Sequence, residues 1–213
     1  MSAFDASDLA CRRGGRPVFS GLGFSLVSGQ ALLLSGANGS GKSSLLRLLA
    51  GLLPASGGSL AWDGAPALTE PQRHAQRLHY LGHLDAVKAG LTVAENLAFW
   101  AGLQEGAHGD EALLHFGLDG LAGEPARLLS AGQRRRLALA RLIAAPRELW
   151  LLAEPAVGLD AVSRERLDNA LADHLAGGGM AVIATHQELG VAAAAELDLD
   201  GFAAGAAEAE HAW

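Results

Sequence analysis

The sequence predicts an α/β fold with a largely parallel sheet, an N-terminal portion built of strands and a helical insertion in the middle. Continuous apolar runs at residues 31–35, 149–152 and 180–185 are typical of buried strands. Helical patterns at 43–53 and 161–176 follow the first two runs. Because strands that alternate with helices usually build parallel sheets, this order predicts the fold class.

The first 64 residues are expected to be mostly strands. Short strands are predicted over residues 4–36, with turns at Gly14–Gly15 and Gly29. Residues 57–64 resemble a further strand between turns. The helix that begins at Ser43 should end near Gly51 and Pro54. One of its faces carries leucines: Leu45, Leu46, Leu48, Leu49 and Leu52.

The middle of the chain, at about residues 84–146, is predicted to form a helical subdomain within a single domain of residues 1–213. Thr92 and Glu95 form a capping-box pattern at the start of one helix. The helix at 161–176 repeats leucine every four residues and ends at three glycines, 177–179. An acidic, alanine-rich tail at about 200–213 closes the chain.

Composition restricts the function classes. A chain of 213 residues with a net charge of −7 is long enough for a real core and lacks the basic excess usual in nucleic-acid binders. Cys11 is the single cysteine, so no internal disulfide is expected. The acidic N-terminus is unlike a signal peptide, and no apolar run is long enough to cross a bilayer. We therefore expect a soluble, cytoplasmic protein that reaches a membrane only through a partner.

A phosphate-binding loop is the strongest motif. The stretch GANGSGKS at 36–43 fits G-x-x-x-x-G-K-[ST], with a predicted strand before it and a helix after it. Its glycines let backbone N–H groups surround phosphates at a helix N-terminus. Lys42 is suited to neutralise the outer phosphates and the Ser43 hydroxyl to ligate Mg²⁺. The predicted nucleotide-binding residues here are Gly36, Ala37, Asn38, Gly39, Ser40, Gly41, Lys42, Ser43 and Ser44.

A second motif, LSAGQ at residues 129–133, begins another predicted helix. Together with the phosphate loop, it resembles the ATP-binding cassette (ABC) ATPases, whose signature is close to LSGGQ; Ala131 departs from that pattern. The resemblance implies that Ser130, Gly132 and Gln133 bind an ATP held by a second subunit, so that a homodimer encloses two nucleotides. Arg134–Arg136 are predicted to be a solvated helix face.

Two further segments extend this resemblance. EPAVGLD at 154–160 is similar to the family's D-loop, which ends at Asp160. ATH at 184–186 is similar to its switch-histidine segment. The resemblance implies that Glu154 is the base or orients the attacking water, and that His186 contacts the γ-phosphate and positions that water.

The chain departs from the family at three positions. Ala153 stands where an aspartate that helps to hold Mg²⁺ is expected; in an alternative register, Glu154 is that carboxylate and no base remains. Leu84 aligns with the glutamine that links the nucleotide to the membrane partner; the flanking His83 and Asp85 are candidate substitutes. Arg13 aligns with the aromatic residue that stacks on adenine. The spacing of His79 and His83 fits a metal site, but without a third ligand we interpret both as ordinary polar residues.

The resemblance narrows at residues 80–100, 128–142 and 147–152 to the ATP-binding subunits of cytochrome c maturation systems. It implies a peripheral subunit at the cytoplasmic face of a bacterial inner membrane, bound to integral membrane subunits that handle haem, with no haem site of its own. An alternative is an assembly subunit that binds ATP but hydrolyses it weakly or not at all, as Ala153 and Leu84 suggest. A DNA-repair ATPase is disfavoured because no heptad run lies between Lys42 and Ser130.

Overall fold

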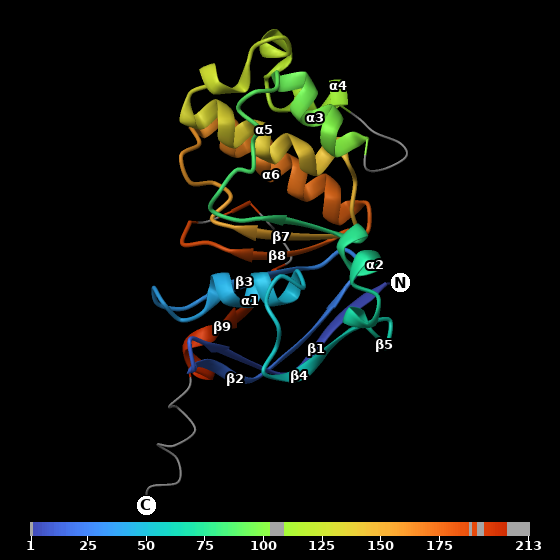
Figure 1. The fold of residues 1–213 in the computed structure, drawn as a ribbon, viewed down its shortest axis with the longest axis vertical. Coiled ribbons are helices and arrows are strands. Elements are labelled where there is room, and N and C mark those ends of the chain that lie inside the picture. Colours follow the sequence, from blue (N-terminus) through green and yellow to red (C-terminus); the bar gives the residue numbers. More distant parts are fainter. Residues whose placement is uncertain (1, 103–108, 188, 191–193, 204–213) are drawn as a thin grey trace, which may run out of the picture.

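Two β-sheets organise the fold in this computed structural model, which describes residues 2–102, 109–187, 189–190 and 194–203 (Figure 1). The antiparallel sheet has the order β2-β1-β4-β5, with β1 at Ala3–Arg13, β2 at Arg16–Val27, β4 at Gly57–Trp62 and β5 at Ala65–Pro66. The parallel sheet has the order β6-β7-β8-β3-β9, with β6 at Leu78–Leu81, β7 at Leu149–Ala153, β8 at Met180–Ala184, β3 at Ala31–Ser35 and β9 at Ala194–Asp198.

The N-terminal strands are longer than the sequence suggested. β1 and β2 span 11 and 12 residues and form one hairpin, whose turn lies at Gly14 and Gly15. Register shifts between Ala6 and Leu9, and again near Cys11, interrupt their pairing. Such bulges bend a strand locally, so two long strands form what the sequence pattern suggested were several short ones.

The parallel sheet is the buried centre of the molecule. Every residue of β7 and β8 is buried, which explains why both strands are continuous apolar runs rather than alternating ones. Side chains alternate between two cores. Leu149, Leu151 and Ala153 pack with the helix α1 (Lys42–Leu49), whereas Trp150 and Leu152 pack with α5 (Ala131–Ala144) and α6 (Ala161–Ala176).

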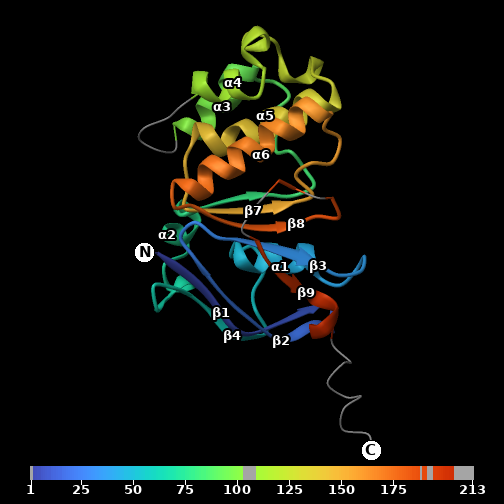
Figure 2. The same cartoon turned by 180° about the vertical axis from the view of Figure 1, so that it is seen from behind.

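Helices α3 (Val93–Ala101), α4 (Gly109–His115), α5 and α6 gather on one side of the parallel sheet, and α1 and the antiparallel sheet lie on the other (Figure 2). The short helices are η1 (Ala67–Thr69), α2 (Pro71–Gln76), η2 (Asp119–Leu121), η3 (Ala126–Leu128) and η4 (Leu199–Phe202). Thr92 and Glu95 form both bonds of the predicted capping box, 3.1 and 2.8 Å long. No helix within the described residues combines the length and apolar character needed to cross a bilayer.

The first long helix ends close to the predicted stop signal at Gly51, but the assignment of Leu52 to its leucine face was wrong. Helix α1 ends at Leu49, and Gly51 adopts a left-handed φ of 72° immediately afterwards. Leu52 therefore lies beyond the helix and is 65% exposed rather than part of its buried leucine face. Residues 204–213 of the predicted acidic tail lie outside the described residues.

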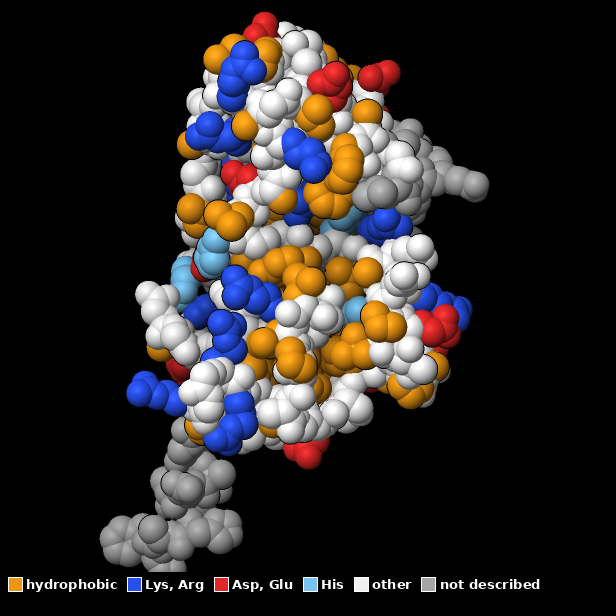
Figure 3. Space-filling view, viewed as in Figure 1, with side chains coloured by type: hydrophobic (Ala, Val, Ile, Leu, Met, Phe, Trp, Pro, Cys, Tyr) orange, Lys and Arg blue, Asp and Glu red, His pale blue; other side chains and the backbone are white. Residues whose placement is uncertain are grey.

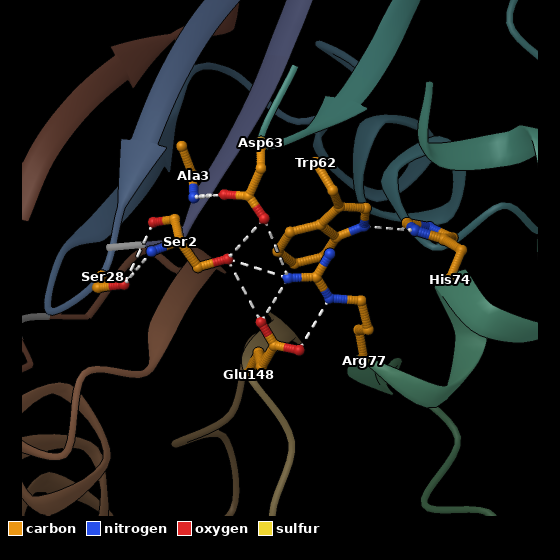
Figure 4. Close-up of polar contacts among 8 residues, drawn as sticks. All are labelled: Ser2, Ala3, Ser28, Trp62, Asp63, His74, Arg77 and Glu148. Atoms are coloured by element: carbon orange, nitrogen blue, oxygen red, sulfur yellow. Dashed lines mark hydrogen bonds and ion pairs between the residues drawn. The ribbon is translucent and has the colours of Figure 1, made fainter. Parts of the chain in front are cut away.

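A polar network joins the two sheets (Figure 4). Arg77 stacks on the Trp62 ring, 3.8 Å from its centroid, and its Nη2 and Nε donate to Glu148 at 2.6 and 2.8 Å. The Trp62 indole donates to Nδ1 of His74 at 3.0 Å, and His74 Nε2 lies 2.8 Å from the Leu49 carbonyl. Because an indole can only donate, Nδ1 of His74 accepts and Nε2 carries the proton. This chain of contacts fixes the end of α1 against the antiparallel sheet.

Candidate functional site

A pocket of about 520 Å³ opens at the carboxyl ends of β7 and β8, beside the start of α1. Ligands of open α/β sheets commonly bind at this edge. Its lining brings together segments that are far apart in the sequence: Val18, Asn38, Gly39, Gly41, Lys42, Ser43, Ser44, His83, Ala153, Glu154, Ala184 and His186.

The phosphate loop forms one wall of this pocket and leads directly into α1. Gly41 has a φ of 106° and is the N-cap residue of the helix. A Cβ atom at Gly41 would lie only 2.7 Å from Val18 and 3.1 Å from Phe19, so only glycine fits between the helix and β2. The loop backbone can therefore approach a ligand closely at the positive end of the helix.

Lys42 is largely buried, with 9% of its surface exposed, and its ammonium group is directed back onto the loop. Nζ donates to the carbonyl oxygens of Gly36 and Ala37 at 2.6 and 3.0 Å. Six of the nine predicted loop residues line the pocket; Gly36, Ala37 and Ser40 are not among the lining residues. Among the residues that the structure describes, Nζ has no carboxylate partner, which suits the lysine charge to an anionic ligand.

Glu154 and His186 form the opposite wall. Ala153, just before Glu154, pairs with Ala184, two residues before His186, across β7 and β8. This pairing brings the two segments together. The His186 N–H lies 3.4 Å from Oε2 of Glu154, and Nε2 of His186 lies 3.7 Å from Oε1. Glu154 has a left-handed φ of 47°, a conformation that is uncommon outside glycine and concentrates at functional sites.

Ala153 is the last residue of β7 and also lines the pocket, although it is only 2% exposed. It presents a methyl group beside Ser43 and Lys42 where the family pattern has a carboxylate. The strand runs through Ala153 and ends before Glu154, so the geometry favours the register in which Ala153 replaces the aspartate.

Arg135 corrects the prediction of a solvated arginine face. It is 7% exposed and donates to the carbonyl oxygens of Ala153, Glu154 and Pro155 at 3.2, 2.7 and 3.2 Å. It also pairs with Asp85 at 2.9 Å. The burial of Arg135 could have been predicted from helical spacing, because Arg135 lies on the same helix face as the buried Leu139 and Leu142.

The three departures from the family pattern lie in different places. Arg13 is exposed at the end of β1 and does not line the pocket; Val18 of β2 does. Leu84 is 86% exposed and also lies outside the lining, whereas His83 is part of it. Asp85 is engaged by Arg135.

His79, by contrast, is buried away from this site. Its Nε2 lies 2.6 Å from the Ala145 carbonyl, and burial lowers its pKa to about 3. No cluster of three metal-ligating side chains occurs among the residues that the structure describes.

The signature and D-loop residues lie outside the pocket that Lys42 lines. Ser130 caps α5 by accepting from the Gln133 N–H at 3.2 Å, and the Gln133 side chain accepts from the Ser130 N–H at 2.7 Å. Asp160 caps α6 by accepting from the Ser163 N–H at 2.8 Å. Hydrogen bonding with the Ser163 side chain, and then with its N–H, lowers the pKa of the Asp160 carboxyl. Gly132 lies against the Gly158 carbonyl, so the two motifs are adjacent.

A glycine-rich loop that carries a buried lysine and leads into a helix at the edge of a parallel sheet is the arrangement of phosphate-loop nucleotide-binding proteins. Residues 19–157 match the ABC transporter family. The chain is 56% identical over 208 residues, covering 95% of this chain and 96% of the relative, to the cytochrome c biogenesis ATP-binding export protein CcmA of Paramagnetospirillum magneticum. It is 53% identical over 202 residues to CcmA of Rhodospirillum rubrum, covering 94% and 87%.

Solved structures show the same fold. The ATP-binding subunit of an ABC transporter superposes with a TM-score of 0.79 at 20% identity, covering 86% of this chain and 79% of the other. A putative ABC transporter ATP-binding protein of Pyrococcus furiosus superposes with a TM-score of 0.80 at 22% identity, covering 95% and 100%. The chain therefore belongs to the ABC transporter family, among the CcmA proteins, and the predicted fold class is confirmed.

Proposed function

We propose that this chain is the ATP-binding and ATP-hydrolysing subunit of a membrane complex for haem handling in cytochrome c maturation. The observation that carries the proposal is that Lys42, Glu154 and His186 line one pocket. The CcmA relatives, named as ATP-binding export proteins of cytochrome c biogenesis, supply the biological setting. The test is ATP turnover by the chain assembled with its membrane subunits; a complex that neither binds nor hydrolyses ATP would refute the proposal.

The pocket suggests a role for each side chain. Lys42 leaves the Gly36 and Ala37 carbonyls to bind the β- and γ-phosphates, while the loop amides and the α1 N-terminus surround them. Glu154 accepts a proton from, or orients, the attacking water, and His186 fixes that water and contacts the γ-phosphate. Arg135 holds the carbonyls on either side of Glu154 and so keeps the carboxylate aimed into the pocket.

Mg²⁺ fits this pocket with fewer protein groups than the family pattern provides. The Ser43 hydroxyl is available, but Ala153 offers a methyl group and Leu84 is directed to solvent. When bound, the ion would neutralise charge on the β- and γ-phosphates. In this chain, Ser43 and the phosphates themselves would supply most of its ligands.

A homodimer explains why Ser130 lies outside the pocket that Lys42 lines. In this arrangement, Ser130, Gly132 and Gln133 of one protomer face the nucleotide of its partner, and Asp160 lies near the same interface. The exposed Val157 and Val162 would be covered there. ATP-dependent dimerisation, measured by light scattering, tests the arrangement; a strictly monomeric chain at saturating ATP in the assembled complex would contradict it.

We propose that the membrane partner contacts the segment Leu84–Leu91. Figure 3 shows apolar side chains gathered across the middle of one face of the molecule. Within the proposed segment, the Leu84 side chain is large, apolar and 86% exposed. This docking would hold the subunit at the cytoplasmic face of the inner membrane, with no nucleic-acid partner and no haem site of its own. Crosslinks from residues 84–91 to the membrane subunits test the docking, and crosslinks found only elsewhere would count against it.

A second candidate is a nucleotide-binding assembly subunit with weak or no hydrolysis. The methyl group of Ala153 in the pocket is the observation that favours it. In that case ATP would bind and hold the complex together without being turned over. Hydrolysis measured in the assembled complex separates the two candidates.

A further inference from the structure

One peptide bond of the phosphate loop is held from both ends. Its oxygen, the Gly36 carbonyl, accepts from Nζ of Lys42 at 2.6 Å. Its N–H, on Ala37, donates to both carboxylate oxygens of Asp200, at 3.1 and 3.0 Å. A cation on the oxygen and an anion on the N–H both strengthen these hydrogen bonds relative to neutral partners.

The fold itself brings Asp200 to this loop from the far end of the chain. β9 pairs in parallel with β3, so that Asp198 lies opposite Ser35, just where the phosphate loop begins. Asp198 then accepts from the Asp200 N–H at 3.0 Å and starts the short helix η4. Leu199, which is fully buried, anchors η4 in the core, and Ala203 bridges to Phe19 of β2.

The space around Gly36 shows how closely this segment packs against the loop. A Cβ atom at Gly36 would lie 2.9 Å from Oγ of Ser40, 3.2 Å from Oδ1 of Asp200 and 3.3 Å from Oδ1 of Asp198. Gly36 also has a φ of 121°, which disfavours any other residue. The backbone conformation therefore favours glycine at this position, and Ser40 with the two aspartates behind the loop leaves little room for a Cβ atom.

The geometry points to Asp200 as a positioning residue of the nucleotide site. Gly36 and Ala37 do not line the pocket, so Asp200 acts on the side of the loop away from the ligand. By fixing the Ala37 N–H, it keeps the start of the loop in place when Lys42 releases the Gly36 carbonyl to bind phosphate. The loop amides are then already arranged for the phosphates, and less ordering is needed on binding.

Three variants test this inference, which rests on the proposed ATP site. Asp200→Ala removes the acceptor, Asp200→Asn keeps an amide oxygen that can accept from Ala37, and Glu196→Gln removes a charge from β9 without a described contact to the loop. The measurements are the Kd of a fluorescent ATP analogue and the thermal unfolding midpoint without nucleotide. We expect Asp200→Ala to weaken binding about 3- to 10-fold, the effect of one net hydrogen bond. Asp200→Asn and Glu196→Gln should stay within about twofold of the parent.

A residue that only stabilised the fold would lower the unfolding midpoint of the nucleotide-free protein. For Asp200→Ala we expect that midpoint to change by no more than about 2 °C, which corresponds to a smaller loss of unfolding free energy than that of one typical hydrogen bond. Equal ATP affinity in Asp200→Ala and the parent would overturn the inference, as would an Asp200→Asn variant as weak as Asp200→Ala. A parent that does not bind the analogue would instead refute the proposed ATP site.

Discussion

Arg135 of helix α5 and Asp85 of the loop after β6 form an ion pair 2.9 Å long, between side chains that are 8% and 27% exposed. Arg135 also donates to three carbonyl oxygens around Glu154. The ion pair therefore connects α5, the end of β7 and the loop that carries Leu84. A change of position in the Leu84 loop would thus reach Glu154 through one side chain.

Replacing Arg135 by alanine should destabilise the protein strongly. The change leaves the buried carbonyl oxygens without a donor and Asp85 without its cation, and removing one partner of a buried pair typically costs about 3–5 kcal/mol. Urea unfolding followed by circular dichroism measures the free energy of unfolding. Arg134→Ala, one residue earlier on the same helix, is the control and should cost less than about 0.5 kcal/mol. Similar costs for the two variants would contradict a bracing role for Arg135.

Replacing Lys42 by alanine should weaken ATP binding by about 10- to 100-fold, the range for hydrogen bonds to a charged group. The physical reason is the loss of the only lysine or arginine among the described residues that line the pocket. Arg47→Ala removes a cation from the exposed face of the same helix and is the matched control. Tight binding of a labelled ATP analogue by Lys42→Ala would show that this loop is wrongly assigned.

Ser130 and Thr92 allow the signature role of Ser130 to be separated from helix capping. Each closes a complete capping box, Ser130 with Gln133 and Thr92 with Glu95. Alanine at either position should cost about 1 kcal/mol of stability. Only Ser130→Ala should also reduce ATP hydrolysis in the assembled complex, because only Ser130 is proposed to face the partner's nucleotide. An equal loss of hydrolysis in Thr92→Ala would mean that Ser130 acts as a cap and nothing more.

Acid should destabilise the fold before the carboxylates titrate. His74 and His79 are buried and His174 is half-buried, with Nε2 against the carbonyls of Leu49, Ala145 and Met180 respectively. Desolvation lowers the pKa of all three, that of His79 to about 3. A histidine in the unfolded chain has a pKa near 6.5, and each unit by which folding lowers that pKa corresponds to about 1.4 kcal/mol. The unfolded chain thus binds more protons, so this stability is complete above pH 6.5 and decreases as pH falls through the folded-state pKa values.

Urea unfolding at pH 8, 6 and 5 tests this sign. Because burial lowers the pKa of His79, His79→Gln should reduce the slope of stability with pH. A stability that stays flat between pH 7 and pH 5 would show that the buried histidines retain ordinary pKa values.

Features set by neighbouring residues could be predicted from the sequence. Helix α6 begins and ends at the predicted residues because its leucine period, the Asp160 cap and the three glycines are all local. Arg135 and Asp200 were missed because their partners are 50 and 163 residues away in the chain, and only the order of strands in the sheet brings them together. Arg13 was predicted from its position in the motif order alone; in the folded chain it does not line the pocket, whereas Val18 of the neighbouring strand does.

Ala153 gives the most specific prediction about catalysis. It is 2% exposed at the end of β7, and its methyl group lines the pocket with Ser43 and Glu154. A methyl group cannot accept a hydrogen bond from a metal-bound water, and groups of this outer-shell kind are typically worth about 10- to 100-fold in metal affinity or activity. ATP should still bind, since Lys42 and the loop amides are intact, but turnover should be slow and need more Mg²⁺ than in relatives that carry the aspartate.

The change Ala153→Asp should therefore raise hydrolysis at least several-fold and lower the Mg²⁺ concentration needed for half-maximal turnover. Ala153→Asn separates hydrogen bonding from charge: its amide oxygen can accept from a metal-bound water but carries no charge, so it should recover less hydrolysis than Ala153→Asp. Parent and variants are compared in the same assembled complex across a Mg²⁺ titration, with ATP affinity measured alongside. Identical curves with brisk turnover in parent and Ala153→Asp would mean that another group already supplies what the aspartate was expected to supply; His83, which lines the same pocket, is a candidate.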